Sequence, residues 1–150
     1  MKTGAWRMNF DGGCSGNPGP MGLGVAIVNL SDTKEYYQIS EPLECGTNNI
    51  AEYRALIKGL KFLYNDLDIQ HGSVSVFGDS MLVIKQMRND YVIRDPRLYQ
   101  LWTEANTLIN ELQKAGNIVT LDHVERERNT EANKLAQSAV AIAKQNRSLE

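Results

Sequence analysis

The chain has 150 residues, of which 42% are hydrophobic and 23% are charged, and its formal net charge is −2. These values fit one folded domain and exclude a disordered chain, and the lack of a basic bias excludes nucleic-acid binding through overall charge alone. The two cysteines match no disulfide framework or zinc ribbon, and no stretch resembles a signal peptide or membrane span, so we expect a cytosolic protein with reduced thiols.

The first part of the chain predicts three strands, at residues 5–10, 22–30 and 33–40. The first alternates the hydrophobic residues Trp6, Met8 and Phe10 with polar ones, as half-buried strands do. Residues 11–20 are rich in Gly and Pro and predict a loop, and residues 41–47 break the strand pattern. Strands this close in sequence are expected to pair as an antiparallel meander.

The rest of the chain predicts helices alternating with two more strands. In order, these are a helix at 49–65, a strand at 73–78, a helix at 81–88 capped by Ser80, a helix at 97–115, a strand at 117–124 and a helix at 130–144. Asn48 is the expected cap of the first helix. Strands that return after helical crossovers lie parallel, so we expect one α/β domain over residues 1–150 with a mixed five-stranded sheet.

Three acidic residues lie at the ends of these elements, although they are far apart in the sequence. Asp11 ends the first strand, Glu52 lies in the first turn of a helix, and Asp79 follows a strand. Each alone has a structural alternative: an Asp-Gly turn, a contact with the helix dipole, and a helix cap. Together, carboxylates that converge on one point offer the oxygen ligands that Mg²⁺ prefers, and paired divalent ions are a known device for cutting phosphodiester bonds.

Four motifs contain these acids or follow them along the chain. They are Asp11-Gly12-Gly13-Cys14-x-Gly16-Asn17-Pro18-Gly19-Pro20-x-Gly22, Thr47-Asn48-Asn49-x-x-Glu52, Gly78-Asp79-Ser80 and Asn129-x-x-Ala132-Asn133-x-Leu135-Ala136. In these motifs and in the order of its elements, the chain resembles the type 1 ribonuclease H family from about Phe10 to Ala139. The resemblance implies the RNase H-like fold and hydrolysis of the RNA strand of RNA–DNA hybrids, leaving 5′-phosphate and 3′-hydroxyl ends.

The resemblance also implies two Mg²⁺ ions, for which Mn²⁺ can substitute. Asp11 would bridge the ions, with Glu52 and Asp79 on either side. The family's fourth acid is replaced here by Asn133, which offers a neutral carbonyl oxygen and adds no charge. We therefore expect weaker binding at the second ion position rather than loss of activity. Natural and engineered origins of Asn133 are both compatible with the sequence.

The resemblance further implies a set of small and polar residues that contact the hybrid. These are Gly12, Cys14, Asn17, Thr47, Asn48, Asn49 and Ser80. Apart from the resemblance, Arg126 or Arg128 is a candidate contact for the cleaved phosphate, because a guanidinium pairs well with phosphate. For the two arginines, a solvated charged turn is the alternative. Residues 85–97 carry only a modest basic patch, so we expect a shallow salt dependence of binding. His123 is expected to pack at the end of a strand and not to act in catalysis.

The expected partner is an RNA–DNA hybrid, with no membrane and no obligate protein partner, and the expected state is a monomer. The main alternative is a catalytically weakened or silent hybrid-binding module of the same fold, which Asn133 favours. A transposase or resolvase core is disfavoured by the loop at 17–20 and by Thr47-Asn48-Asn49. A metabolic enzyme is disfavoured because the sequence lacks a glycine fingerprint for a nucleotide cofactor.

Overall fold

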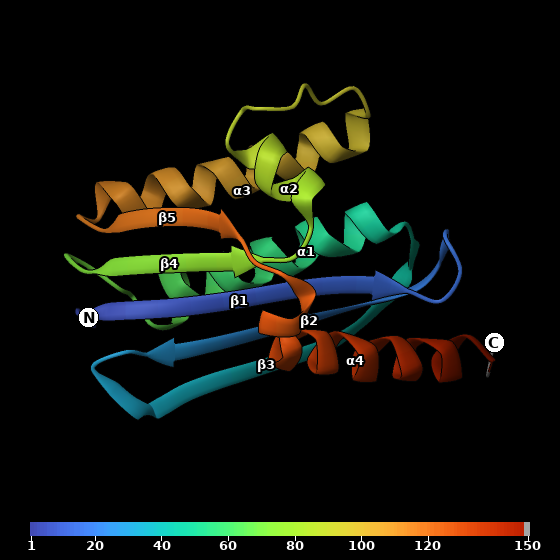
Figure 1. Cartoon of the computed structure of the whole chain (residues 1–150), viewed down its shortest axis with the longest axis horizontal. Helices are drawn as coiled ribbons and strands as arrows, with labels where there is room; N and C mark the ends of the chain where they lie inside the picture. Colours follow the sequence, from blue (N-terminus) through green and yellow to red (C-terminus); the bar gives the residue numbers. More distant parts are fainter. Residues whose placement is uncertain (149–150) are drawn as a thin grey trace.

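The computed structural model describes residues 1–148, which form a five-stranded mixed sheet with helices on both faces (Figure 1). The strands lie in the order β3-β2-β1-β4-β5. The elements are β1 (Ala5–Cys14), β2 (Gly19–Asn29), β3 (Asp32–Gly46), α1 (Asn48–Lys61), the π-helical turn η1 (Phe62–Asp66), β4 (Ser73–Gly78), α2 (Met81–Met87), α3 (Pro96–Lys114), β5 (Ile118–His123), the 3₁₀ turn η2 (Arg126–Arg128) and α4 (Thr130–Ser148). β1, β2 and β3 pair antiparallel, β4 lies parallel to β1, and β5 lies parallel to β4. The predicted fold class, meander and parallel strands are confirmed.

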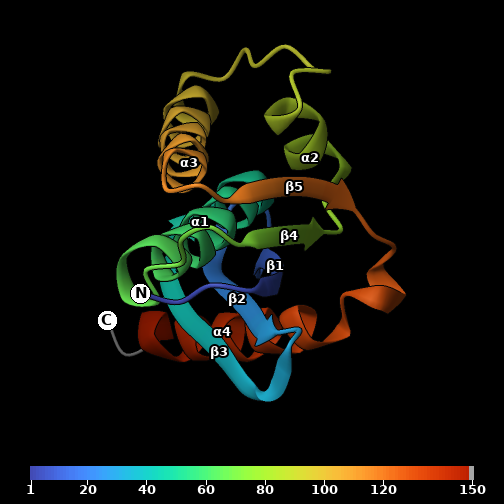
Figure 2. The same ribbon diagram turned by 90° about the vertical axis from the view of Figure 1, so that its left-hand side faces the viewer.

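The main core lies between the sheet and helices α1 and α3. Trp6, Met8 and Phe10 of β1 are at most 1% exposed, which confirms the predicted alternation. Met8 and Val25 pack against Gly59 of α1, where an added Cβ would lie 2.2 Å from the Met8 methyl group. Neighbouring residues of a strand point to opposite faces of the sheet. Gly24 therefore faces away from α1, toward α4 on the other side of the sheet (Figure 2).

Helix α4 lies unusually close to the sheet because both surfaces carry very small residues. Its buried alanines recur at helical spacing and are Ala132, Ala136, Ala139 and Ala143. They face Gly22 and Gly24 of β2, where an added Cβ would lie 2.5 Å from the Val140 nitrogen and 2.4 Å from the Ala132 carbonyl oxygen, respectively. The helix backbone thus rests directly on the strand. No helix among residues 1–148 is both long and apolar enough to cross a lipid bilayer.

Replacing Gly24 by alanine is expected to destabilise the protein by about 1–3 kcal/mol, because the new methyl group has to push the α4 backbone outward. Gly13→Ala is the matched control, since its Cβ would meet nothing closer than Val140 Cγ2 at 3.8 Å. Urea unfolding of both variants measures the difference. Equal midpoints for the two variants would contradict this account of how α4 packs.

The sequence prediction is wrong at two segments that it assigned to loops. Residues 11–14 continue β1, and the β1–β2 ladder runs to the pair Cys14 and Met21. Residues 41–46 continue β3, because β3 is an edge strand and an irregular register opposite Pro42 accommodates the missing N–H. The cap of α1 is Thr47 rather than Asn48: its side-chain oxygen accepts a hydrogen bond from the Ile50 N–H at 3.3 Å. Ser80 caps α2, as expected.

Candidate active site

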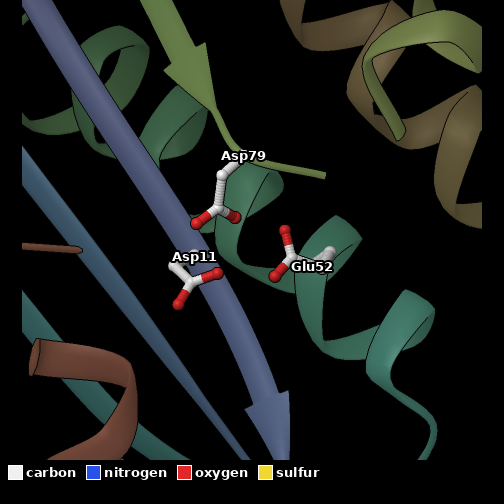
Figure 3. Close-up of side chains that lie close together, drawn as sticks. All are labelled: Asp11, Glu52 and Asp79. Carbon is white, nitrogen blue, oxygen red and sulfur yellow. The ribbon is translucent and has the colours of Figure 1, made fainter. Parts of the chain in front are cut away.

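The sheet and helix α1 bring the three predicted acids together. The parallel register of β1 and β4 pairs Phe10 with Gly78, so Asp11 and Asp79, the next residue of each segment, lie side by side. Glu52 extends from the first turns of α1 toward them (Figure 3). One carboxylate oxygen of each residue lies within 4.8 Å of the others. The predicted convergence of Asp11, Glu52 and Asp79 is therefore present.

Gly12 makes this arrangement possible. An added Cβ at Gly12 would lie 2.2 Å from the Ala51 carbonyl carbon, so only glycine lets α1 come this close to β1. At this distance the Gly12 N–H donates a hydrogen bond to Glu52 Oε1 at 2.9 Å. The strand backbone thus orients the Glu52 carboxylate. The Asp-Gly pair, whose alternative reading was a turn, lies instead inside a strand.

Burial and mutual repulsion disfavour the charged forms of Asp11 and Glu52. Burial, followed by the Asp79 carboxylate, raises the pKa of Asp11 from 3.8 to about 6, although a hydrogen bond with Glu52 and the Arg126 charge oppose this. Burial, a hydrogen bond with Asp11 and the Asp11 charge raise the pKa of Glu52 well above its usual value. Within residues 1–148, Glu52 Oε2 and Asp79 Oδ2 are buried and have no hydrogen-bond partner. Buried acids that lack partners fit a site for a divalent cation, which supplies the missing positive charge.

The acids open into a cavity of about 460 Å³. Its lining comprises Asp11, Gly12, Gly13, Cys14, Asn48, Asn49, Glu52, Asp79, Ser80, Arg126, Ala136, Gln137 and Val140. Of the residues predicted to contact the hybrid, all but Asn17, Thr47 and Arg128 belong to this set. The cavity is therefore acidic at its centre and surrounded by amide, hydroxyl and backbone groups.

Asn17 and Thr47 lie outside the lining but hold parts of it in place. Asn17 Oδ1 accepts a hydrogen bond from the Asn48 N–H at 3.2 Å. The Cys14 thiol donates to the Gly16 carbonyl at 2.6 Å and approaches Asn48 Oδ1 at 3.2 Å. The loop between β1 and β2 is thereby fixed to the start of α1. Among the residues that the structure covers, Cys14 and Cys45 are both free thiols.

The two arginines of η2 lie in different places. Arg126 lines the acidic cavity, whereas Arg128 lines a separate cavity of about 320 Å³ with Arg7, Asn9 and Thr130. A 3₁₀ turn has three residues per turn, so residues two apart point to different sides. His123 is half-buried at the end of β5, opposite Gly78, as expected from the sequence.

Asn133 lies in the first turns of α4, one turn before Ala136 and Gln137 of the cavity wall. It is only 6% exposed, and its Nδ2 donates to the Arg126 carbonyl at 3.2 Å. Its Oδ1 is buried without a hydrogen-bond partner in the described part of the chain. A buried carbonyl oxygen without a partner fits a ligand of a cation or of a water bound to it.

Sequence reasoning missed two residues that shape the site. Gln137 and Val140 line the cavity from α4, but in the sequence they are ordinary members of a helix. Asn129, which is 1% exposed, donates from Nδ2 to the Phe10 carbonyl at 2.9 Å and ties the start of α4 to β1 beside Asp11. Asn129 is part of a motif noted in the sequence, but its role in holding α4 against β1 became clear only from this contact.

Comparisons with known proteins place this architecture in a family. The reverse transcriptase-like family matches residues 9–139. The bifunctional protein Rv2228c of Mycobacterium tuberculosis is 33% identical over 135 residues, which are 90% of this chain and 35% of that protein. Ribonuclease HI of Halobacterium salinarum is 32% identical over 135 residues, 87% of this chain and 62% of that protein. The chain thus spans about a third of the mycobacterial relative.

Solved structures agree with these matches. The N-terminal RNase H domain of Rv2228c, solved as a fusion with maltose-binding protein, has a TM-score of 0.85 and 31% identity over 95% of this chain and 98% of that one. LC11-RNase H1, solved in complex with an RNA/DNA hybrid, has a TM-score of 0.81 and 30% identity over 92% and 98% of the two chains. The chain therefore belongs to the reverse transcriptase-like family, and these matches place it among the type 1 ribonuclease H domains.

Proposed function

We propose that this chain is a ribonuclease H that hydrolyses the RNA strand of RNA–DNA hybrids, leaving 5′-phosphate and 3′-hydroxyl ends. The observation that carries the proposal is the cluster of Asp11, Glu52 and Asp79, in which one carboxylate oxygen of each residue lies within 4.8 Å of the others. Two carboxylate oxygens of the cluster, Glu52 Oε2 and Asp79 Oδ2, are buried without a partner among the described residues. The similarity to LC11-RNase H1, which was solved with a hybrid, supports the same substrate class here.

The residues of the cluster have distinct roles in this proposal. Asp11, Glu52 and Asp79 would hold two divalent ions, Mg²⁺ with Mn²⁺ as a substitute, with Asp11 shared by the two ions. Asn133 contributes its neutral Oδ1 to the weaker ion position. When bound, such a pair of ions would supply activation of the attacking water and stabilisation of the leaving 3′ oxygen. The Gly12 N–H keeps the Glu52 carboxylate oriented for this purpose.

The rim of the cavity supplies the contacts that distinguish RNA from DNA. Proteins detect RNA through its 2′-hydroxyl groups, which both donate and accept hydrogen bonds. Asn48, Asn49 and Ser80 line the cavity with groups of the matching kind. Asn17 fixes Asn48 from the opposite loop, which makes the rim rigid before substrate arrives. We assign these residues to the RNA strand and Thr47 to a phosphate of the DNA strand.

Hybrid binding is expected to depend only weakly on salt, because most cations of the predicted basic patch are already engaged. Arg88 pairs with Asp122 at 3.3 Å, Arg97 pairs with Asp95 at 3.0 Å, and Lys85 lies 5.0 Å from the centre of the Tyr91 ring. With about two or three phosphates neutralised, raising the salt from roughly 50 to 200 mM should weaken binding only about tenfold to fortyfold. Fluorescence anisotropy with a labelled hybrid measures this slope.

Arg126 and Arg128 provide matched variants for the same experiment. Arg126→Ala is expected to lower the slope by about one counterion, whereas Arg128→Ala, in the separate cavity, should leave it unchanged. A steep slope, or equal effects of the two substitutions, would contradict the assignment of Arg126 to a phosphate.

A cleavage assay tests the proposed function directly. A hybrid labelled on either strand is incubated with the protein in Mg²⁺ or Mn²⁺, and the ends of the fragments are identified. Fragments from the RNA strand alone, with 5′-phosphates, are the expected result. Binding without fragments in either metal would establish the alternative that Asn133 favours, a silent hybrid-binding module.

A cytosolic location and a monomeric single domain are further proposals, and size-exclusion chromatography tests the monomer.

A further inference from the structure

The first residue of the short turn η2, Arg126, has a carbonyl oxygen that accepts two hydrogen bonds. The Arg126 carbonyl accepts the backbone N–H of Asn129 at 3.0 Å and the side-chain Nδ2 of Asn133 at 3.2 Å. Both acceptor positions of this oxygen are therefore used. The second bond requires a donor at position 133, and an amide provides one whereas an ionised carboxylate does not.

The base of the turn is fixed independently of this bond. Asn129 Nδ2 donates to the Phe10 carbonyl at 2.9 Å, and Asn9 Nδ2 donates to Asn129 Oδ1 at 3.0 Å. These bonds hold the C-terminal end of the turn against β1. A change at position 133 is thus expected to release the Arg126 end of the turn and leave the Asn129 end in place.

The Arg126 side chain has little else to hold it. It is exposed, it lines the acidic cavity, and within residues 1–148 no carboxylate forms an ion pair with it. The position of its guanidinium therefore depends on the backbone of η2. That backbone is fixed on one side by Asn129 and on the other by Asn133.

We propose that Asn133 is a positioning residue for Arg126, whose guanidinium meets the phosphate of the hybrid; this inference rests on the proposed function. The amide of Asn133 orients the turn that carries Arg126, while the carbonyl oxygen of the same side chain, buried without a partner among the described residues, is left for the ion position. One residue thereby serves both the metal site and the phosphate contact. An aspartate at position 133 improves the first role and loses the second.

The two roles separate in a double-mutant cycle. Asn133→Ala is expected to raise the Kd for a labelled hybrid in EDTA roughly fivefold to tenfold, and to raise it much less when Arg126 is already alanine. An equal effect in both backgrounds would overturn the proposal. If the alanine variant does not fold, Asn133→Ser replaces it, with the same expected direction. Arg128→Ala in place of Arg126→Ala is the matched control background and should show no coupling.

Asn133→Asp should change the Mg²⁺ requirement and KM in opposite directions, which a purely structural role would not produce. It is expected to lower the Mg²⁺ concentration for half-maximal cleavage, since the site gains a charge, and to raise KM for the hybrid in saturating Mg²⁺. Asn110→Asp makes the same chemical change at an exposed residue of α3, and should alter neither value. An unchanged Mg²⁺ requirement would refute the assignment of Asn133 to the weaker ion position. An unchanged KM would refute its role in positioning Arg126.

Hydrogen exchange tests the contact without any activity. In the Asn133 variants the amides of Arg128 and Asn129, which close the turn, should exchange several-fold faster, with the amides of α4 unchanged. If the wild-type protein neither binds nor cleaves a hybrid, the proposed function fails, yet this measurement still reports on the Asn133–Arg126 bond. Unchanged exchange at both amides would overturn the positioning role by itself.

Discussion

Asp79→Asn is expected to slow cleavage of an RNA–DNA hybrid by roughly a hundredfold or more. The substitution keeps the size of the side chain and removes one of three charges that converge within 4.8 Å. Metal ions contribute several kcal/mol of charge stabilisation to such reactions, and about 3 kcal/mol corresponds to a hundredfold in rate. The loss should appear in kcat, because Asp79 is not needed to hold the hybrid. Affinity should stay the same or rise slightly, since the phosphates then face one negative charge fewer.

Asp122→Asn is the matched control for Asp79→Asn. Asp122 lies on β5, beside β4, and pairs with the exposed side chain of Arg88 at 3.3 Å. Loss of an exposed ion pair changes stability by at most about 1 kcal/mol, and cleavage should stay within roughly twofold of wild type. Single-turnover cleavage with excess enzyme measures both variants. Equal rates for Asp79→Asn and Asp122→Asn would remove Asp79 from the active site.

The parts of the site that could be predicted from the sequence are those set by local rules. The alternation over 73–78 and the cap at Ser80 predicted the strand–helix junction that carries Asp79, and both are confirmed. The positions of Asp11 and Glu52 followed from the motifs. Their meeting depends on the parallel register of β1 and β4 and on the close approach at Gly12, which no local pattern contains.

The error at residues 11–14 has a physical origin. Gly12 and Gly13 were read as signs of a loop, because glycine commonly marks turns. In the structure they lie inside β1, and the missing side chain of Gly12 lets α1 rest on the strand backbone, as Gly22 and Gly24 of β2 do for α4. Composition alone does not separate a glycine that turns the chain from one that admits a neighbouring helix.

The choice between Arg126 and Arg128 likewise lay beyond the sequence. Both follow the last strand and both alternate with glutamates, so charge patterning treats them alike. A single turn of 3₁₀ helix sends them into different cavities. The motif marked Asn133 as a candidate, but its bond to the Arg126 carbonyl depends on how the turn folds back onto α4.

The metal-free protein is expected to lose stability as the pH rises from about 4 to about 6. Burial, and then the charge of Asp79, raise the pKa of Asp11 to about 6, whereas the unfolded chain has the ordinary value of 3.8. Between these values the folded protein holds a proton that the unfolded chain has released. The resulting stabilisation is complete below pH 4 and is lost as the pH passes the folded pKa. For Asp11 it amounts to on the order of 3 kcal/mol, and Glu52, whose pKa is also raised by burial, adds to the loss.

Urea unfolding of the wild type and of Asp11→Asn, at several pH values with and without Mg²⁺, measures this effect. Other groups cancel in the comparison, including Glu35, whose pKa its Lys2 partner lowers to about 2. At about pH 7.5 Asp11→Asn should be more stable than the wild type, although inactive. The stabilisation of the wild type by Mg²⁺ should be larger at about pH 7.5 than at about pH 5. If the two proteins were equally stable at pH 7.5 and gained equally from Mg²⁺, Asp11 would neither destabilise the metal-free protein nor contribute to Mg²⁺ binding. The burial that disfavours the charged forms of Asp11 and Glu52 without a cation also favours the binding of a cation there, so both effects should disappear together when Asp11 is replaced.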